Sequence, residues 1–322
     1  MLAGNNNSMP RKLIIDGDMG TDDAVALCML LFDSRIDVVA LTATEGCVTA
    51  VQANSNLQAI ISELDPDRHP RLGMAFPTTG APAITARHLY GEDGLGNAGF
   101  ETSSKQRLLP SEKLIIDLVR MEPGEVSILC LGPLTNIARA LQRDPAIENM
   151  IHRLIMVGGS IVGIGNVTPS AEFNFYFDPK SAQTVFRSKM TKSLIPLDVT
   201  RQVSFGLDLI GELPVDTTRA GFFLRQILPF SFRAFRQQLG QETVTLNDAV
   251  GALAVLEPDL FTFEEMAGDV EAEGTLTRGV TVFDRRPTPE WRSNMEVATS
   301  IRVDAAKQVL LDQLNISGKA TA

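Results

Sequence analysis

The sequence has little cysteine and histidine, and it lacks both a long apolar run and a strongly basic segment. Its three cysteines, Cys28, Cys47 and Cys130, are odd in number and far apart, so they indicate neither a disulfide framework nor a cysteine-rich zinc site. The first residues lack the apolar core of a secretory signal, and no later segment supplies roughly 18 uninterrupted apolar residues. We therefore expect a cytoplasmic protein that does not enter a membrane.

The charge and size of the chain narrow its class further. The net charge is −10, and no run of Lys and Arg is dense enough to follow a phosphate backbone. Nucleic acid is therefore not an expected partner. With 322 residues, of which 44% are hydrophobic, the chain can bury a large core as one sizeable α/β domain or as two smaller ones.

Strand-like apolar runs alternate with segments of helical periodicity along the chain. The pattern predicts strands at 12–15, 36–44, 71–75, 126–131, 154–157 and 193–196, with helices at 22–32, 49–64, 111–120, 134–141, 222–239 and 248–256. A hairpin at 269–284, a strand at 297–303 and a closing helix at 305–314 follow. Such alternation predicts an α/β fold with an open, mainly parallel, doubly wound (Rossmann-like) sheet.

No segment has the composition of a linker that would split the chain. The glycine-rich stretch 90–99 is interpreted as an active-site loop rather than a domain boundary. We therefore expect a single domain over residues 10–316, with flexible ends at 1–9 and 317–322 that carry no function.

Four carboxylates follow the first predicted strand within eight residues, at Asp16, Asp18, Asp22 and Asp23. Ligands of an open parallel sheet bind outside the carboxyl ends of its strands, which is where these residues lie. Carboxylates packed this closely repel each other unless a cation lies among them. An acidic helix start would explain Asp22 or Asp23 but leaves Asp16 and Asp18 unexplained.

The chemistry of the candidate ligands indicates which cation is suited to the cluster. All of them are hard oxygens, and the three histidines, His69, His88 and His152, lie outside the acidic segment. These oxygens favour Ca²⁺ or Mg²⁺ over zinc.

Two later turns offer further polar groups at the same edge of the sheet. The turn at 132–136 exposes backbone carbonyls, although Thr135 alone could be an ordinary helix cap. The loop at 165–174 carries Asn166, Glu172 and Asn174, which suit the hydroxyls of a sugar, although surface loops are often polar for no such reason.

Taken together, the motifs resemble the inosine-uridine preferring nucleoside hydrolases. The similarity rests on DGDMGTDDA, the turn GPLTN, the loop GN-x-TP-x-AEFN followed by DP, and the late Asp248, in order from about Lys12 to Leu314. The resemblance implies a calcium-dependent enzyme that hydrolyses the N-glycosidic bond of ribonucleosides to free base and ribose. It also implies a homodimer or homotetramer.

The resemblance assigns roles residue by residue. It implies that Asp18 and Asp23, the carbonyl of Thr135 and Asp248 bind calcium, and that Asp18 is the base for a calcium-bound water. Asp16 would support this shell from behind. The residues that would bind the ribose are Asp22, Asn166, Glu172 and Asn174, of which Asn166 and Glu172 would hold the 5′ end.

Several positions depart from the family pattern. The histidine that usually precedes the late aspartate, and that donates a proton to the departing base, is Asn247 here, and an amide cannot act as that acid. The loop that commonly begins with histidine begins with Tyr90, the usual asparagine after strand two is Cys47, and Met19 stands where proline is common. We expect Tyr90 and Cys47 to contact the substrate. Metal and ribose positions are thus kept, whereas the base-side positions are altered.

Two other functions stay open at this point. Asn247, Tyr90 and Cys47 are compatible with a ribose-binding protein that has lost catalysis. An Asp-x-Asp motif after strand one also begins the haloacid dehalogenase type of phosphatase, but Gly20 fills the place where that class has a threonine. Separate assays of phosphate release and ribose release would distinguish the three functions.

Overall fold

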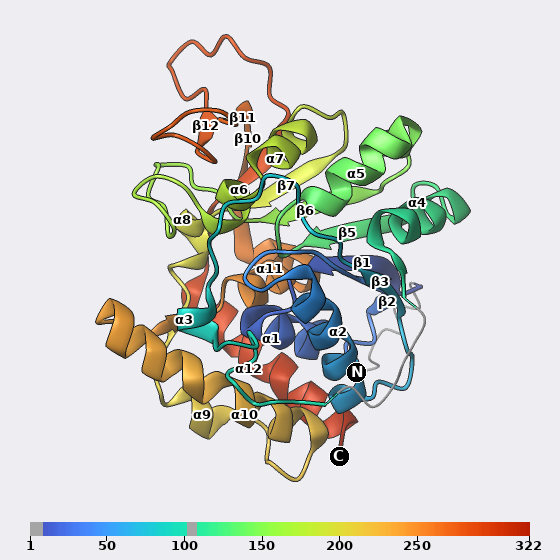
Figure 1. Cartoon of the computed structure of the whole chain (residues 1–322), viewed down its shortest axis with the longest axis vertical. Helices are drawn as coiled ribbons and strands as arrows, with labels where there is room; N and C mark the ends of the chain where they lie inside the picture. The colour runs from blue at the N-terminus through green and yellow to red at the C-terminus, as the bar shows by residue number, and fades with distance from the viewer. Residues whose placement is uncertain (1–8, 102–107) are drawn as a thin grey trace, which may run out of the picture.

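The computed structural model describes residues 9–101 and 108–322, so the expected flexible segment at 1–9 lies outside the described residues except for Met9. A nine-stranded sheet runs through the described part in the order β10-β13-β7-β6-β5-β1-β2-β3-β4 (Figure 1). The paired strands are parallel except for β10, which is antiparallel to β13. The strands are β1 (Arg11–Gly17), β2 (Ile36–Ala43), β3 (Arg71–Met74), β4 (Leu109–Pro110), β5 (Val126–Cys130), β6 (Arg153–Val157), β7 (Lys192–Ile195), β10 (Phe261–Met266) and β13 (Met295–Ile301).

Helices cover both faces of this sheet. The longer ones are α1 (Thr21–Leu30), α2 (Ala50–Leu64), α4 (Ser111–Met121), α5 (Thr135–Arg143), α7 (Pro179–Phe186), α10 (Arg219–Ala234), α11 (Asn247–Leu256) and α12 (Val303–Ala320). Along β1, Leu13 and Ile15 enter the core shared with α1, α2, α10, α11 and α12, whereas Ile14 enters the core shared with α4, α5 and α7. The predicted doubly wound α/β fold is therefore confirmed.

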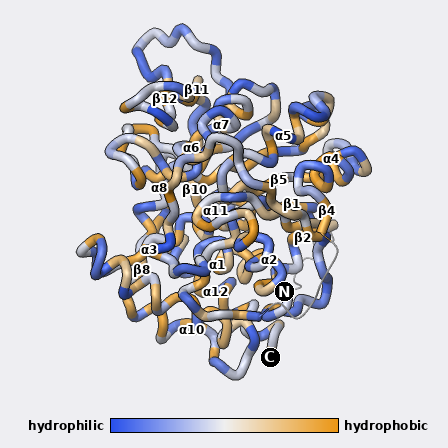
Figure 2. The backbone as a smooth tube through the Cα atoms, viewed as in Figure 1, coloured by the Kyte–Doolittle hydropathy of each residue, from blue (hydrophilic) through white to orange (hydrophobic). Residues whose placement is uncertain are grey.

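Helix α1 is buried on every side, which brings its acidic first turn into the interior. All of its residues are buried, and after Asp23 the sequence AVALCML carries no charge. A helix that is apolar all round belongs inside a protein, and α1 packs against the helices α10, α11 and α12 (Figure 2). Asp22 and Asp23 therefore lie where water has little access.

Several short elements connect the strands and the longer helices. The predicted hairpin is present as β11 (Gly268–Val270) and β12 (Thr281–Phe283). The other short elements are β8 (Ser204–Phe205), β9 (Val244–Thr245), α3 (Arg87–Tyr90), α6 (Phe173–Phe177), α8 (Leu197–Thr200), α9 (Leu209–Glu212) and the single turns η1 (Pro145–Asn149), η2 (Phe235–Leu239) and η3 (Pro258–Leu260). Most are too short to show a hydrophobic period, so sequence patterning did not predict them.

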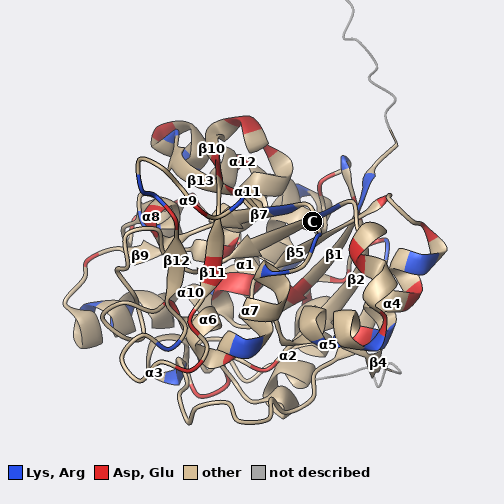
Figure 3. Ribbon diagram, turned by 90° about the horizontal axis from the view of Figure 1, so that it is seen from above, with Lys and Arg blue, Asp and Glu red and all other residues tan. Residues whose placement is uncertain are grey.

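The surface of the described residues is mixed in charge. Lys and Arg are scattered over many elements in Figure 3 rather than gathered into one stripe. Over the described ranges, we find no helix long and apolar enough to cross a membrane.

The carboxyl end of the chain differs from the expected flexible segment at 317–322. Helix α12 continues through Ala320, with Ser317 fully buried and with Gly318 so close to Pro214 that an added Cβ would lie 2.5 Å from the Pro214 Cβ. The carbonyl of Thr321 accepts a hydrogen bond from Arg219 N, and its hydroxyl accepts one from Ala220 N, each at 3.1 Å. The end of the chain therefore caps the first turn of α10.

Deleting residues 317–322 should destabilise the protein. The deletion uncovers the Pro214 surface and leaves two N–H groups of α10 without partners. Losing a helix cap costs about 1 kcal/mol, so a shorter chain should melt at least about 2 °C lower in a calorimetric scan. Deleting Ala322 alone is the control and should change nothing. Equal melting temperatures for all three chains would show that the end of α12 does not stabilise the fold.

Candidate functional site

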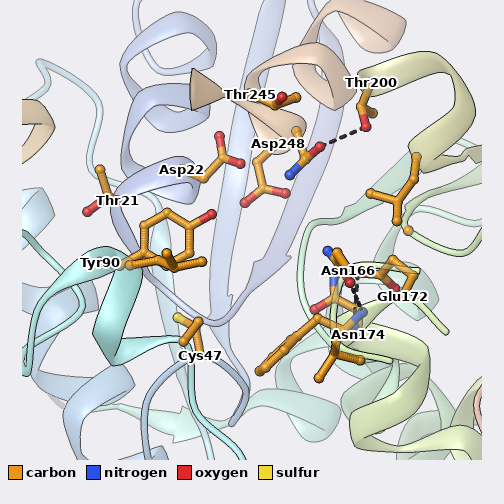
Figure 4. Close-up of a pocket in the computed structure, with 18 of the residues that line it drawn as sticks. Thr21, Asp22, Cys47, Tyr90, Asn166, Glu172, Asn174, Thr200, Thr245 and Asp248 are labelled. Carbon is orange, nitrogen blue, oxygen red and sulfur yellow. Dashed lines mark hydrogen bonds between the residues drawn. The ribbon is translucent and has the colours of Figure 1, made fainter. Parts of the chain in front are cut away.

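A cavity of about 680 Å³ opens at the carboxyl ends of the parallel strands (Figure 4). Its walls come from the loops after β1, β2, β5 and β6, from α3 and η2, and from the start of α11. Ten of the residues that the sequence suggested line this one cavity: Asp18, Asp22, Asp23, Cys47, Tyr90, Asn166, Glu172, Asn174, Asn247 and Asp248. Thr135, which the sequence also suggested, does not line it.

Asp18 and Asp23 form the deepest part of the acidic cluster. An oxygen of Asp18 accepts a hydrogen bond from Cys47 N at 2.6 Å, and an oxygen of Asp23 accepts one from Gly20 N at 2.9 Å. The second oxygen of Asp23 is buried and has no partner. Burial, and then the negative charge of the neighbouring Asp18, holds the pKa of Asp23 well above its usual range.

Asp22 and Asp248 meet where the first turns of α1 and α11 face each other. Burial raises the pKa of Asp22 to about 7, against backbone hydrogen bonds from Asp248, Asn247 and Ala249 that favour the charged form. One Asp22 oxygen is buried without a partner. Burial, then the charges of Asp22 and Asp23, holds the pKa of Asp248 well above its usual range. The N-terminus of α11 thus partly offsets the Asp22 charge.

Asp16 lies below the cavity and does not line it. One of its oxygens accepts hydrogen bonds from Thr42 Oγ1 at 2.6 Å and from Asn136 Nδ2 at 2.8 Å. Burial raises the Asp16 pKa to about 7 despite these two donors. Its place behind Asp18 suits a supporting residue, as the resemblance implied.

Glycines allow the backbone to approach the acidic side chains closely. A Cβ added at Gly17 would lie 2.0 Å from Asp23 Oδ1, and one added at Gly46 would lie 2.1 Å from Asp18 Oδ2. At Gly132 the added Cβ would lie 2.9 Å from the backbone nitrogen of Asp18. The three turns therefore enclose the carboxylates without room for a further carbon.

The turn after β5 brings a different carbonyl to the cavity than the one suggested by the sequence. Thr135 is already the first residue of α5, and its hydroxyl donates to Asp178 Oδ2 at 2.7 Å. Leu131, at the end of β5, lines the cavity, and its carbonyl accepts from Asn174 Nδ2 at 2.7 Å. Leu131, four residues before Thr135, is therefore the residue of this segment that lies at the cavity.

Glu172 and the two asparagines form a polar wall beside the carboxylates. Glu172 caps α6, because its carboxylate accepts from Asn174 N at 2.9 Å, from Gly159 N at 3.1 Å and from Phe175 N at 3.2 Å. Burial nevertheless raises its pKa to about 7. Asn166 Oδ1 accepts from Phe173 N at 2.8 Å. These contacts fix the positions of the side chains that face the cavity.

The remaining wall contains aromatic and amide groups. The rings of Tyr90 and Phe235 lie 6.2 Å apart at 59°, and the Tyr90 hydroxyl points toward Asp22 and Asp248 in Figure 4. Burial holds the Tyr90 pKa well above its usual range. Asn247 Oδ1 accepts from Thr200 Oγ1 at 2.7 Å. Phe235 and Thr200 were not suggested by the sequence, because contacts with residues far along the chain bring them here.

Cys47 is a buried member of the same cavity. Its thiol lies 3.8 Å from the carbonyl oxygen of Asp18, and an added Cβ at Gly20 would lie 2.9 Å from its sulfur. Burial holds the pKa of the thiol well above its usual range. The thiol therefore stays protonated and behaves as a small apolar group against the acidic turn.

The geometry describes an α/β protein that binds a polar ligand against carboxylates at the ends of its parallel strands, as the doubly wound architecture favours. Comparison with known proteins gives the family. Residues 13–308 match the inosine-uridine preferring nucleoside hydrolases, and the chain belongs to this family. The protein is thus a nucleoside N-glycosidase, which hydrolyses the N-glycosidic bond of ribonucleosides.

Similar proteins cover nearly the whole chain. A probable uridine nucleosidase of Oryza sativa subsp. japonica is 32% identical over 288 residues, which is 88% of each chain. The non-specific ribonucleoside hydrolase RihC of Salmonella paratyphi B is 32% identical over 92% of this chain and 95% of its own. The solved purine-preferring ribonucleoside hydrolase of Gardnerella vaginalis is 27% identical, with a TM-score of 0.88 over 97% of this chain and 99% of its own.

Substituting Gly46 by alanine should disturb the acidic cluster. The new Cβ would displace the Asp18 carboxylate, and a misplacement near 1 Å can cost roughly 10²-fold in rate. We expect nucleoside turnover, measured as released reducing sugar, to fall at least tenfold for Gly46→Ala. Gly211→Ala is the matched control, because an added Cβ at Gly211 meets no atom within 4 Å. Equal turnover in both variants would contradict the close packing around Asp18.

Proposed function

We propose that the protein hydrolyses ribonucleosides with Asp18 as the general base and with one calcium ion held among the carboxylates of the cavity. The observation that supports this proposal most directly is the group of buried carboxyls that follow β1 and begin α11. In this group, Asp22 and Asp23 each keep an oxygen without a partner. Buried carboxylates without partners are costly unless they bind a cation or a proton.

The donor set fits a hard divalent cation. We propose that Asp18, Asp23, Asp248 and the carbonyl of Leu131 hold it, with Leu131 in place of Thr135. Within the described part of the chain, no three His, Cys, Asp or Glu side chains are already arranged to hold a metal ion. A metal ion would therefore bind with the oxygens of these side chains drawn closer together. Oxygen donors from carboxylates and a carbonyl favour calcium over zinc.

When bound, calcium supplies Lewis acidity and a template for the two adjacent hydroxyls of a ribose. The side chains of the cavity then hold the remainder of the sugar. The unpartnered oxygen of Asp22 suits a ribose hydroxyl, and Asn174, whose Nδ2 donates to the Leu131 carbonyl, lines the same cavity. Asn166 and Glu172 would hold the 5′ end. A deoxyribose offers one hydroxyl fewer and should bind poorly.

The cleavage step uses these carboxylates in two ways. Asp18 takes a proton from the attacking water, whose oxygen forms the new bond to C1′ as the bond from C1′ to the base breaks. The ribose passes through an oxocarbenium-like state, which the negative charges around it stabilise. Retention of all four aspartates favours an enzyme over a ribose-binding protein that has lost catalysis. A homodimer or homotetramer and a cytoplasmic location remain predictions.

Replacing Asp18 by asparagine should remove the base while leaving the fold intact. An amide oxygen can still accept the hydrogen bond from Cys47 N, but it cannot take a proton from water. We expect turnover to fall by about 10²-fold or more, with little change in melting temperature. Asp198→Asn is the control, because Asp198 accepts bonds from Ile161 N and Val162 N outside the cavity. An Asp18→Asn protein with near-normal turnover would contradict the assigned base.

Calcium should raise the melting temperature of chelator-stripped protein, and this gain should depend on Asp23. In chelator, Asp23→Asn should melt higher than the unaltered protein, because it removes a charge from a buried like-charged cluster. Added calcium should then stabilise the unaltered protein more than the variant. Asp33→Asn is the matched control, because Asp33 is a buried carboxylate that pairs with Arg35 instead. The Asp33→Asn variant should melt at a lower temperature than the unaltered protein, both with and without calcium, because it loses the ion pair with Arg35. An equal gain for Asp23→Asn and the unaltered protein would contradict the metal site.

A further inference from the structure

The cavity wall beside Asp22 and Asp248 offers aromatic and amide groups but little that releases a proton at neutral pH. We name this wall, formed by Tyr90, Thr200, Phe235, Thr245 and Asn247, the leaving-group wall. Because the Asn247 oxygen accepts from Thr200 Oγ1 at 2.7 Å, its NH₂ group is the part left to face a ligand. An amide N–H can donate a hydrogen bond but cannot transfer its proton to a departing base.

The other protic groups near this wall have different roles or positions. The Tyr90 hydroxyl points toward Asp22 and Asp248, on the side of the cavity where we propose that the ribose binds (Figure 4). His88 is the single histidine among the described cavity residues, and it is exposed at the mouth. A neutral nucleobase must gain a proton as its bond to the ribose breaks, and the leaving-group wall supplies none.

The charge of the cavity favours a cationic ligand. Six carboxyl groups line it, from Asp18, Asp22, Asp23, Glu172, Glu242 and Asp248. The guanidinium among the lining residues, Arg201, is bound to the carbonyls of Ile164 and Gly165 at 3.1 and 2.6 Å. The raised pKa values described above mean that these six groups are not all charged at once. Among the described lining residues, one arginine and no lysine accompany the six acidic groups, so the cavity favours a positively charged substrate over a negatively charged one.

Building on the proposed function, we propose that this cavity prefers ribosides whose base is itself cationic, such as an N-ribosyl pyridinium or an N7-alkylated purine. When the bond between C1′ and nitrogen breaks, its electron pair neutralises the positive ring, and the base leaves as a neutral molecule without needing a proton. The water oxygen forms the new bond to C1′, and the water proton passes through Asp18 to solvent. The rings of Tyr90 and Phe235 suit a flat cationic base.

The test compares cationic and neutral ribosides of similar shape on the unaltered enzyme. The pairs are 7-methylguanosine with guanosine, and N-ribosyl-3-carbamoylpyridinium with uridine, each scored as kcat/KM from released reducing sugar. A general acid is worth about 10²- to 10⁴-fold, so we expect each cationic riboside to exceed its neutral partner by at least about 10²-fold. Equal kcat/KM values within the pairs would overturn the proposal.

A neutral riboside of p-nitrophenol distinguishes this proposal from the proposed function, because nitrophenolate also leaves without a proton. Rapid cleavage of this riboside together with slow cleavage of both cationic ribosides would overturn the cationic preference and leave the hydrolase function standing. If none of the five ribosides releases ribose, the proposed function itself fails.

Cationic ribosides are also more labile by themselves, which would raise their kcat/KM on any enzyme. A variant of Asn247 distinguishes this effect from the absence of an acid. Asn247→His places an imidazole at the leaving-group wall. The kcat/KM for 7-methylguanosine divided by that for guanosine should then fall at least about tenfold. Asn247→Asp serves as a second acid if the histidine variant does not fold. An unchanged ratio in both would overturn the proposal. So would a His88→Ala protein that loses guanosine hydrolysis alone, because His88 would then be the acid.

Discussion

Repulsion among buried carboxylates is the constraint on which the arrangement of this site depends. Helix α1 is apolar after its first turn and is buried on every side, so it carries Asp22 and Asp23 into the interior. Asp248 lies at the start of α11. The backbone at Gly17 and Gly46 packs directly against the side chains of Asp23 and Asp18, so these carboxylates cannot move apart in that direction. The charges can be balanced by protons, by helix N-termini or by a cation, and we propose that the substrate sugar binds beside them.

The sequence predicted those parts of the fold and site that depend on local pattern. Alternating apolar periods gave the doubly wound sheet, and Asp18 and Asp23 stood out because they follow a buried strand. Thr135 was suggested by its place in the GPLTN turn, but it is the first residue of α5 and does not line the cavity, because the residues that reach a cavity depend on where a turn enters its helix. Thr200 and Phe235 carry no local signal, since tertiary packing alone brings them to Asn247 and Tyr90. Helix α12 continues past the predicted end at residue 314, because the small residues Ser317 and Gly318 pack in its last turn where no large apolar side chain marks it.

The cavity has two halves with different chemistry. The carboxylates, Asn174 and the Leu131 carbonyl form the half that suits a metal ion and a ribose, and hydrogen bonds to backbone groups fix their positions. The half around Tyr90 and Asn247 is formed by aromatic rings and amides, and we propose that it governs how the base leaves. A single family fold can therefore keep its sugar chemistry while the identity of its leaving group changes.

The central claim is that the acidic cluster holds one hard divalent cation. Calorimetric titration of calcium into chelator-stripped protein, with elemental analysis of the same sample, tests it most directly. The account predicts saturation at one calcium ion per chain and no retained zinc. Stoichiometric zinc in the purified protein, or the absence of calcium binding together with full nucleoside hydrolysis in excess chelator, would contradict it.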